Sequence, residues 1–148
     1  MRTPQTDPAA PRREPETIAA WDFRRGLSGW TPNAGVVRTR LAPDGLAMAV
    51  RGPDPFLTSP PLARACGPVA VAVLKIRSTG DPIAQIYHGA TFAEARSVSF
   101  AVRNDGRWHE VRVVLPALEA GDRIRLDPCH TSGDVGVAYL RLEAHDAA

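Results

Sequence analysis

Polar and aromatic residues that could bind a ligand recur at alternate positions of several β-like segments. Gln85 and Tyr87 lie two residues apart, and Arg77, Arg112 and Arg125 each follow or interrupt a run of apolar residues. An aromatic ring can stack on the apolar face of a sugar, and guanidinium groups form forked hydrogen bonds with carboxylates or sulfates. These residue types therefore indicate a ligand-binding surface.

The alternation predicts which of these side chains point outward. In a β-strand, side chains two residues apart share a face. If the strands share one sheet, Gln85, Tyr87, Arg77, Arg112 and Arg125 line one outward face, which would suit an acidic or uronate-type glycan. The alternative is a solvated face of an amphipathic sheet, with arginine stems covering apolar surface.

Catalytic motifs are absent from the sequence. It contains no Gly-x-Ser-x-Gly elbow, phosphate loop or dinucleotide fingerprint. We therefore assign no catalytic residue. The enzyme alternative is a lyase, cyclase or isomerase that uses Tyr87, His88 or His109 as an acid–base pair in a groove.

Metal ligands do not form a recognisable motif either. The histidines have no regular spacing and no Cys-x-x-Cys occurs. We assign no metal residue and no cofactor, but a structural Ca²⁺ is an open alternative, with carboxylates from Asp22, Asp44, Asp127 or Glu143. Asp127 precedes a proline, which favours a turn that ends a strand over a ligand contact.

Composition and charge describe an ordinary globular domain. The chain has 148 residues, 44% of them hydrophobic and 23% charged, with 14 prolines and 12 glycines. A net charge of +2 gives no argument for nucleic acid binding.

No apolar run approaches the ~20 residues of a membrane span. No apolar stretch follows Arg12-Arg13, so we predict no signal peptide and a cytoplasmic location by default. Arginine-rich, lysine-poor usage is typical of a bacterial, GC-rich genome.

Short runs separated by turn residues predict an all-β fold. The segments from Val69 to Arg77, Ile83 to His88 and Ser97 to Val102 are β-like, and Pro43-Asp44-Gly45 predicts a hairpin turn. We count nine or ten strands, typical of an antiparallel β-sandwich. Residues 1–18 are predicted to be a disordered tail, 19–143 the sandwich domain, and 144–148 a second tail.

The order of several short motifs resembles the galactose-binding-like jelly-roll domains. The motifs are Trp21-Asp22-Phe23, Gly26-Leu27-Ser28-Gly29-Trp30, Asp44-Gly45-Leu46, Ser59-Pro60-Pro61-Leu62, Gln85-Ile86-Tyr87-His88 and Arg125-Leu126-Asp127-Pro128. Related domains are appended as carbohydrate-binding-module-like units to bacterial glycosyltransferases, polysaccharide lyases and glycoside hydrolases. His88 stands where a tryptophan of their aromatic pair is expected.

The resemblance implies a non-catalytic carbohydrate-binding or accessory module, with an acidic glycan as one ligand. The expected ligand-binding residues are Gln85, Tyr87, His88, Arg77, Arg112 and Arg125. The expected partner is a carbohydrate or another small polar ligand, with a neighbouring catalytic domain or protein as a further partner, and neither nucleic acid nor membrane. A protein-interaction domain is the third alternative.

Overall fold

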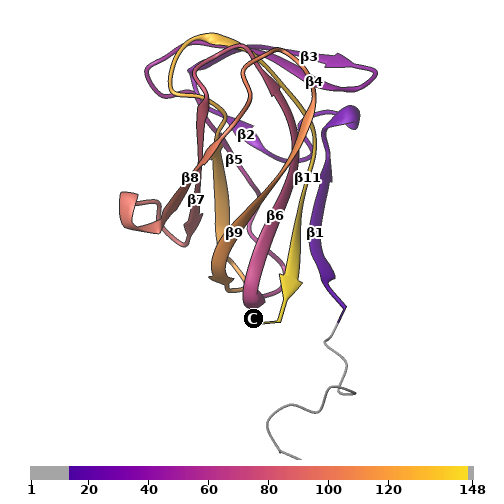
Figure 1. The fold of residues 1–148 in the computed structure, drawn as a ribbon. Helices are drawn as coiled ribbons and strands as arrows, with labels where there is room; N and C mark the ends of the chain where they lie inside the picture. Colours follow the sequence, from indigo (N-terminus) through magenta and orange to yellow (C-terminus); the bar gives the residue numbers. More distant parts are fainter. Residues whose placement is uncertain (1–13, 147–148) are drawn as a thin grey trace, which may run out of the picture.

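The structure, a computed structural model, describes residues 14–146. They form eleven β-strands and two 3-10 helices (Figure 1). The elements are β1 (Glu16–Asp22), η1 (Phe23–Arg25), β2 (Thr31–Pro32), β3 (Val36–Ala42), β4 (Gly45–Val50), β5 (Leu57–Thr58), β6 (Cys66–Ser78), β7 (Ile83–Gly89), η2 (Glu94–Arg96), β8 (Ser97–Ala101), β9 (His109–Leu118), β10 (Arg123–Asp127) and β11 (Gly133–His145).

The strands form two sheets. Sheet A has the order β3-β4-β11-β6-β9, and β1 also pairs with β11. Sheet B has the order β2-β5-β10-β7-β8. All pairings are antiparallel, so the expected antiparallel β-sandwich is confirmed. Within residues 14–146, no helix is long and apolar enough to cross a membrane.

Strand alternation builds the core between the sheets. Every second side chain of the long strands is apolar and buried. One cluster joins Leu74, Leu140 and Leu142 of sheet A to Ile86, Ile124 and Leu126 of sheet B, all at most 1% exposed. The intervening side chains are thereby directed to the two outer faces, where a ligand could reach them.

The domain boundaries differ slightly from the expected ones. β1 begins at Glu16, so residues 16–18 are strand rather than tail, because they pair with the end of β11. β11 likewise continues through His145. Residues 14 and 15 of the expected N-terminal tail are exposed and form no strand, and its residues 1–13 lie outside the described residues.

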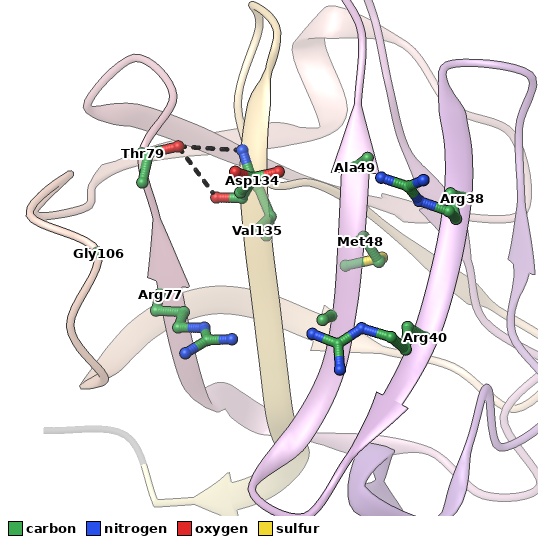
Figure 2. Close-up of a pocket in the computed structure, with 10 residues that line it drawn as sticks. Arg38, Arg40, Met48, Ala49, Arg77, Thr79, Gly106, Asp134 and Val135 are labelled. Carbon is green, nitrogen blue, oxygen red and sulfur yellow. Dashed lines mark hydrogen bonds between the residues drawn. The ribbon is translucent and has the colours of Figure 1, made fainter.

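The outer face of sheet A carries arginines on strands at and near its edge. Arg38 and Arg40 of β3 project from the same side of the sheet as Arg77 of β6 (Figure 2).

The two cysteines, Cys66 and Cys129, are buried free thiols, and burial raises the pKa of both.

Candidate functional site

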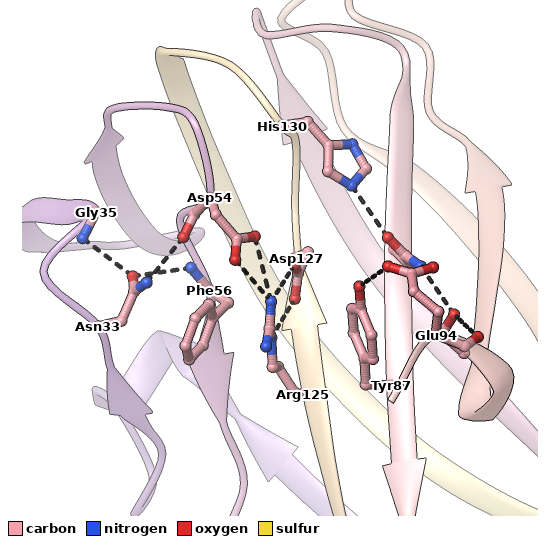
Figure 3. A network of polar contacts seen from close by, with 11 residues as sticks. Asn33, Gly35, Asp54, Phe56, Tyr87, Glu94, Arg125, Asp127 and His130 are labelled. Atoms are coloured by element: carbon pink, nitrogen blue, oxygen red, sulfur yellow. Dashed lines mark hydrogen bonds and ion pairs between the residues drawn. The ribbon is translucent and has the colours of Figure 1, made fainter. Parts of the chain in front are cut away.

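Sheet B brings together three of the expected ligand-binding residues. Gln85 and Tyr87 of β7 and Arg125 of β10 point to its outer face, because Arg125 pairs with Tyr87 in the strand register. Asp127 of β10, Glu94 of η2 and several loop residues complete a group that we call the sheet B cluster (Figure 3). It consists of Asp54, Phe56, Gln85, Tyr87, Glu94, Arg125, Asp127 and His130.

Arg125 is enclosed by aromatic rings and carboxylates. Its guanidinium carbon lies 3.6 Å from the ring centroid of Phe56 and 4.4 Å from that of Tyr87 (Figure 3). Nε and Nη2 each donate to Asp127 at 2.8 Å, and Nη2 also donates to Asp54 at 3.0 Å. The charge expected to bind an acidic glycan is therefore already neutralised within the chain.

Asp127 is the most deeply buried member of the cluster. Its side chain is 1% exposed. Burial raises its pKa to about 6, while the hydrogen bonds from Arg125 oppose the rise. We expected this residue to act as a turn device before Pro128. It does end β10, but its carboxylate pairs with a side chain, so its main role is to hold Arg125.

Tyr87 and Gln85 are held by a second carboxylate. The Tyr87 hydroxyl donates to Glu94 at 2.6 Å, which together with burial raises the pKa of Tyr87 to about 12. The Gln85 amide donates to Ser97 at 2.8 Å, and its oxygen lies 3.1 Å from His130 Nε2. Gln85 is 7% and Tyr87 9% exposed. Both side chains therefore support neighbouring residues and leave little area that a ligand could contact.

An open hollow adjoins the sheet B cluster at β2 and β5. Its volume is about 550 Å³, and Thr31, Thr58, Phe56 and Arg123 contribute to its lining. Within residues 14–146, the side chains of Thr31, Thr58 and Arg123 make no hydrogen bond or ion pair. We call this the β5 hollow. It offers an aromatic ring, two hydroxyls and a guanidinium to a ligand.

The other expected ligand-binding residues lie elsewhere. His88 is 8% exposed and pairs in register with the core residue Ile124, so it points between the sheets, and burial lowers its pKa. Arg77 and Arg112 lie on the outer face of sheet A, because β6 and β9 belong to that sheet. The expectation that all five outward residues share one face was therefore wrong for Arg77 and Arg112.

The acid–base alternative requires Tyr87, His88 and His109 to lie close together, and the fold separates them. Tyr87 and His88 are neighbours on one strand, so they point to opposite sides of sheet B. His109 lies at the start of β9 in sheet A, and its Nε2 is 2.9 Å from Asp105. Among the described residues 14–146, these three side chains therefore do not face a common groove.

The carboxylates considered for calcium do not form a site. Asp22 pairs with Arg24, Asp44 accepts from Trp108, Asp127 pairs with Arg125, and Glu143 with Arg141. Each lies on a different element. Across residues 14–146, no group of three His, Cys, Asp or Glu side chains is placed to hold a metal ion.

Sequence reasoning missed the loop residues of the sheet B cluster and the lining of the β5 hollow. Asp54, Phe56 and His130 lie in loops and show no periodicity. Arg123 carried a usable signal, since it alternates with Ile124 on the same strand as Arg125.

The sequence matches no known protein family and no curated protein. Solved structures do match. The N-terminal cellulose-binding domain of Cellulomonas fimi β-1,4-glucanase C has a TM-score of 0.64 at 12% identity, covering 90% of this chain and 99% of that domain. The C-terminal CBM6 of the laminarinase LamC from Zobellia galactanivorans has a TM-score of 0.63 at 12% identity, covering 86% and 98%.

A third match comes from a different functional class. The K3 adhesin domain of Lys-gingipain from Porphyromonas gingivalis has a TM-score of 0.60 at 12% identity, covering 88% of this chain and 99% of that domain. The shared feature is thus the fold. This chain has the β-sandwich architecture found in carbohydrate-binding modules, and the expected resemblance to them is confirmed at that level.

Proposed function

We propose that this chain is a non-catalytic carbohydrate-binding module whose ligand occupies the β5 hollow on sheet B. The similar structures include cellulose-binding and xylan-binding domains, which supports a glycan as the ligand class. The observation that carries the proposal is the set of unpaired polar groups of Thr31, Thr58 and Arg123 beside the ring of Phe56.

The dimensions and chemistry of the hollow agree with a sugar. Binding sites for small ligands have volumes of about 300–1,000 Å³, and this one has about 550 Å³. Phe56 supplies a ring for the apolar side of a pyranose, and the hydroxyl and guanidinium groups supply hydrogen bonds. The sheet B cluster holds Phe56 in place through its stacking on Arg125.

A neutral glycan suits this face better than an acidic one. The lining of the hollow includes one charged side chain, Arg123. In the adjoining sheet B cluster three carboxylates, of Asp54, Asp127 and Glu94, outnumber Arg125 and oppose an anionic ligand. Carboxylates accept hydrogen bonds from sugar hydroxyls but repel uronate groups. Preference for an acidic ligand remains a prediction, which we take up for another surface below.

Binding assays with purified neutral oligosaccharides test the proposal. Isothermal titration with cello-, laminari- and xylo-oligosaccharides should detect binding by the native chain. Arg123→Ala should weaken it about 10- to 100-fold, because a hydrogen bond to a charged group contributes about 1.5–3 kcal/mol. Arg103→Ala, at an exposed arginine that lines neither hollow, is the matched control.

Two results would contradict the proposal. One is no binding of any neutral oligosaccharide at millimolar concentration, which would favour the protein-interaction alternative. The other is unchanged affinity in Arg123→Ala, which would place the ligand elsewhere on the molecule.

A further inference from the structure

A second hollow lies on the opposite side of the sandwich, on the outer face of sheet A. Its volume is about 380 Å³. Arg38 and Arg40 of β3 form one wall and Arg77 of β6 the other, with Asp134 of β11 at one end (Figure 2). We call it the arginine groove. It shares no lining residue with the β5 hollow.

Small residues in the two intervening strands keep the groove open. The register places Arg40 beside Ala47, Ala47 beside Gly136, and Gly136 beside Arg77. A Cβ on Gly136 would lie 2.8 Å from Arg77 Nε, so glycine lets the arginine side chain extend across β11. Figure 2 shows Arg40 and Arg77 pointing toward one another over this floor.

The three guanidinium groups make no direct contact with a carboxylate in the described residues, although the charge of Arg77 acts on nearby Asp44, whose pKa the Trp108 hydrogen bond and this charge lower. In the part of the chain that the structure describes, none of Arg38, Arg40 and Arg77 forms an ion pair or hydrogen bond. Arg77 instead lies 5.0 Å from the ring centroid of Trp108, and Trp108 is held by a 3.0 Å hydrogen bond to Asp44. A hydrogen-bonded ring thus orients Arg77 and leaves its N–H groups available to a ligand.

Asp134 adds a hydrogen-bond acceptor to the groove. Its backbone is fixed to Thr79, with N donating to Thr79 Oγ1 at 3.0 Å and the carbonyl accepting from Thr79 N at 3.0 Å. Within residues 14–146 its carboxylate makes no hydrogen bond or ion pair, so it can accept from a ligand hydroxyl. The groove therefore presents three cations to an anion and one carboxylate to hydroxyl groups.

Protection of a sheet edge explains only part of this arrangement. Charged residues on an edge strand oppose pairing with another sheet, and β3 is an edge strand that carries Arg38 and Arg40. Arg77 lies on β6, an inner strand of sheet A. The pairing of β6 with β9 ends at Ile76, but Gly106 N donates to Ser78 O just beyond it, so β6 is not an open edge at Arg77. Edge protection therefore does not explain why Arg77 lies across the groove from Arg40, with no ion pair or hydrogen bond of its own in the described residues.

We propose that the arginine groove binds a saccharide unit that carries a sulfate or carboxylate group. The anion lies between Arg38, Arg40 and Arg77, which can contact it by forked hydrogen bonds, and the hydroxyls face Asp134. This assigns the acidic glycan expected from the sequence to sheet A. The assignment does not depend on sugar binding in the β5 hollow.

Titration with defined oligosaccharides tests the groove. The probes are a heparin tetrasaccharide for sulfate, an oligogalacturonate for carboxylate, cello-oligosaccharide as the neutral probe, and a single-stranded oligonucleotide of equal charge. The native chain should bind at least one of the two acidic saccharides, more weakly as salt increases. Which of the two binds identifies the anionic group. Arg77→Gln and Arg38→Gln/Arg40→Gln should weaken that binding at least tenfold.

Control variants separate this site from the β5 hollow. Arg103→Gln makes the same charge change outside both hollows, and Arg123→Ala alters the β5 hollow alone; both should bind the acidic saccharide as the native chain does. Equal melting temperatures would show that Arg77→Gln is folded. The proposal is overturned if neither acidic saccharide binds, if Arg77→Gln binds as tightly as Arg103→Gln, or if the oligonucleotide binds as tightly as the saccharides.

Discussion

Replacing Arg125 with methionine would leave a buried carboxylate without its cation. Asp127 is 1% exposed and receives two 2.8 Å hydrogen bonds from Arg125. Removing one partner of a buried ion pair costs about 3–5 kcal/mol, and the contacts with Phe56 and Tyr87 are lost as well. We therefore expect Arg125→Met to lower the free energy of unfolding by about 3–5 kcal/mol at pH 8.

The size of this effect should depend on pH. The native pKa of Asp127, about 6, is above its unfolded value near 3.8, so the native state binds more protons between these values. Stability from this group therefore falls as the pH rises through that range. Without Arg125 the pKa rises further and the fall is larger. The difference between variant and native protein should grow from pH 5 to pH 8.

Urea unfolding followed by tryptophan fluorescence measures the effect. With a denaturant slope of about 2 kcal/mol per molar, the midpoint should fall by ~1.5–2.5 M at pH 8. The double variant Arg125→Met/Asp127→Asn should regain most of the loss, since no buried charge remains. Arg112→Met, which breaks a half-exposed pair with Glu143, is the control and should cost less than ~1 kcal/mol.

Either of two results would refute the reasoning. The first is that Arg125→Met lowers the free energy of unfolding by no more than Arg112→Met does. The second is that Arg125→Met/Asp127→Asn is no more stable than Arg125→Met. Either outcome would mean that Arg125 does not support the buried carboxylate.

Three further predictions concern other parts of the molecule. Burial opposes ionisation of Glu143, but its hydrogen bonds with arginine and histidine outweigh this and lower its pKa to about 2. Its stabilisation should therefore be complete above pH 4.5 and lost toward pH 2, and thermal unfolding of Glu143→Gln should show a shallower decline there. Ultraviolet titration of the native protein should show Tyr87 ionising with a pKa of about 12 and Tyr139 with a pKa above its ordinary 10.0, and both pKa values should return to the ordinary value in denaturant. Leu74→Ala should cost about 2–5 kcal/mol in urea unfolding and Val114→Ala less than ~0.5 kcal/mol, because Leu74 is 0% and Val114 64% exposed.

Local patterns predicted the strands and the direction of their side chains. Alternation correctly placed Gln85 and Tyr87 on one face and Ile124 opposite Arg125, because side-chain direction in a strand repeats every two residues. The Asp44-Gly45 turn also joins two paired strands as expected. These features depend on neighbouring residues alone.

Assignment of strands to sheets depends on long-range pairing, which local alternation does not contain. Arg77 and Arg112 face outward as predicted, but on the other side of the sandwich. The direction of a side chain within a strand says nothing about which sheet the strand joins. Asp54 and His130 were missed because loops have no period, and only the folded chain brings them to the sheet B cluster.

The position of β11 has a consequence for how the domain is made. This strand pairs with β1, β4 and β6 in sheet A, yet it comes last of all described strands (Figure 1). During synthesis the N-terminal end emerges first, so β1 has no described partner strand until residues 139–144 leave the ribosome. Pairing over such sequence separations slows folding. The nascent chain therefore carries an unpaired edge of β6 from the synthesis of Ser78 until residues 135–145 have been added, and a chaperone that covers that edge would act at this stage.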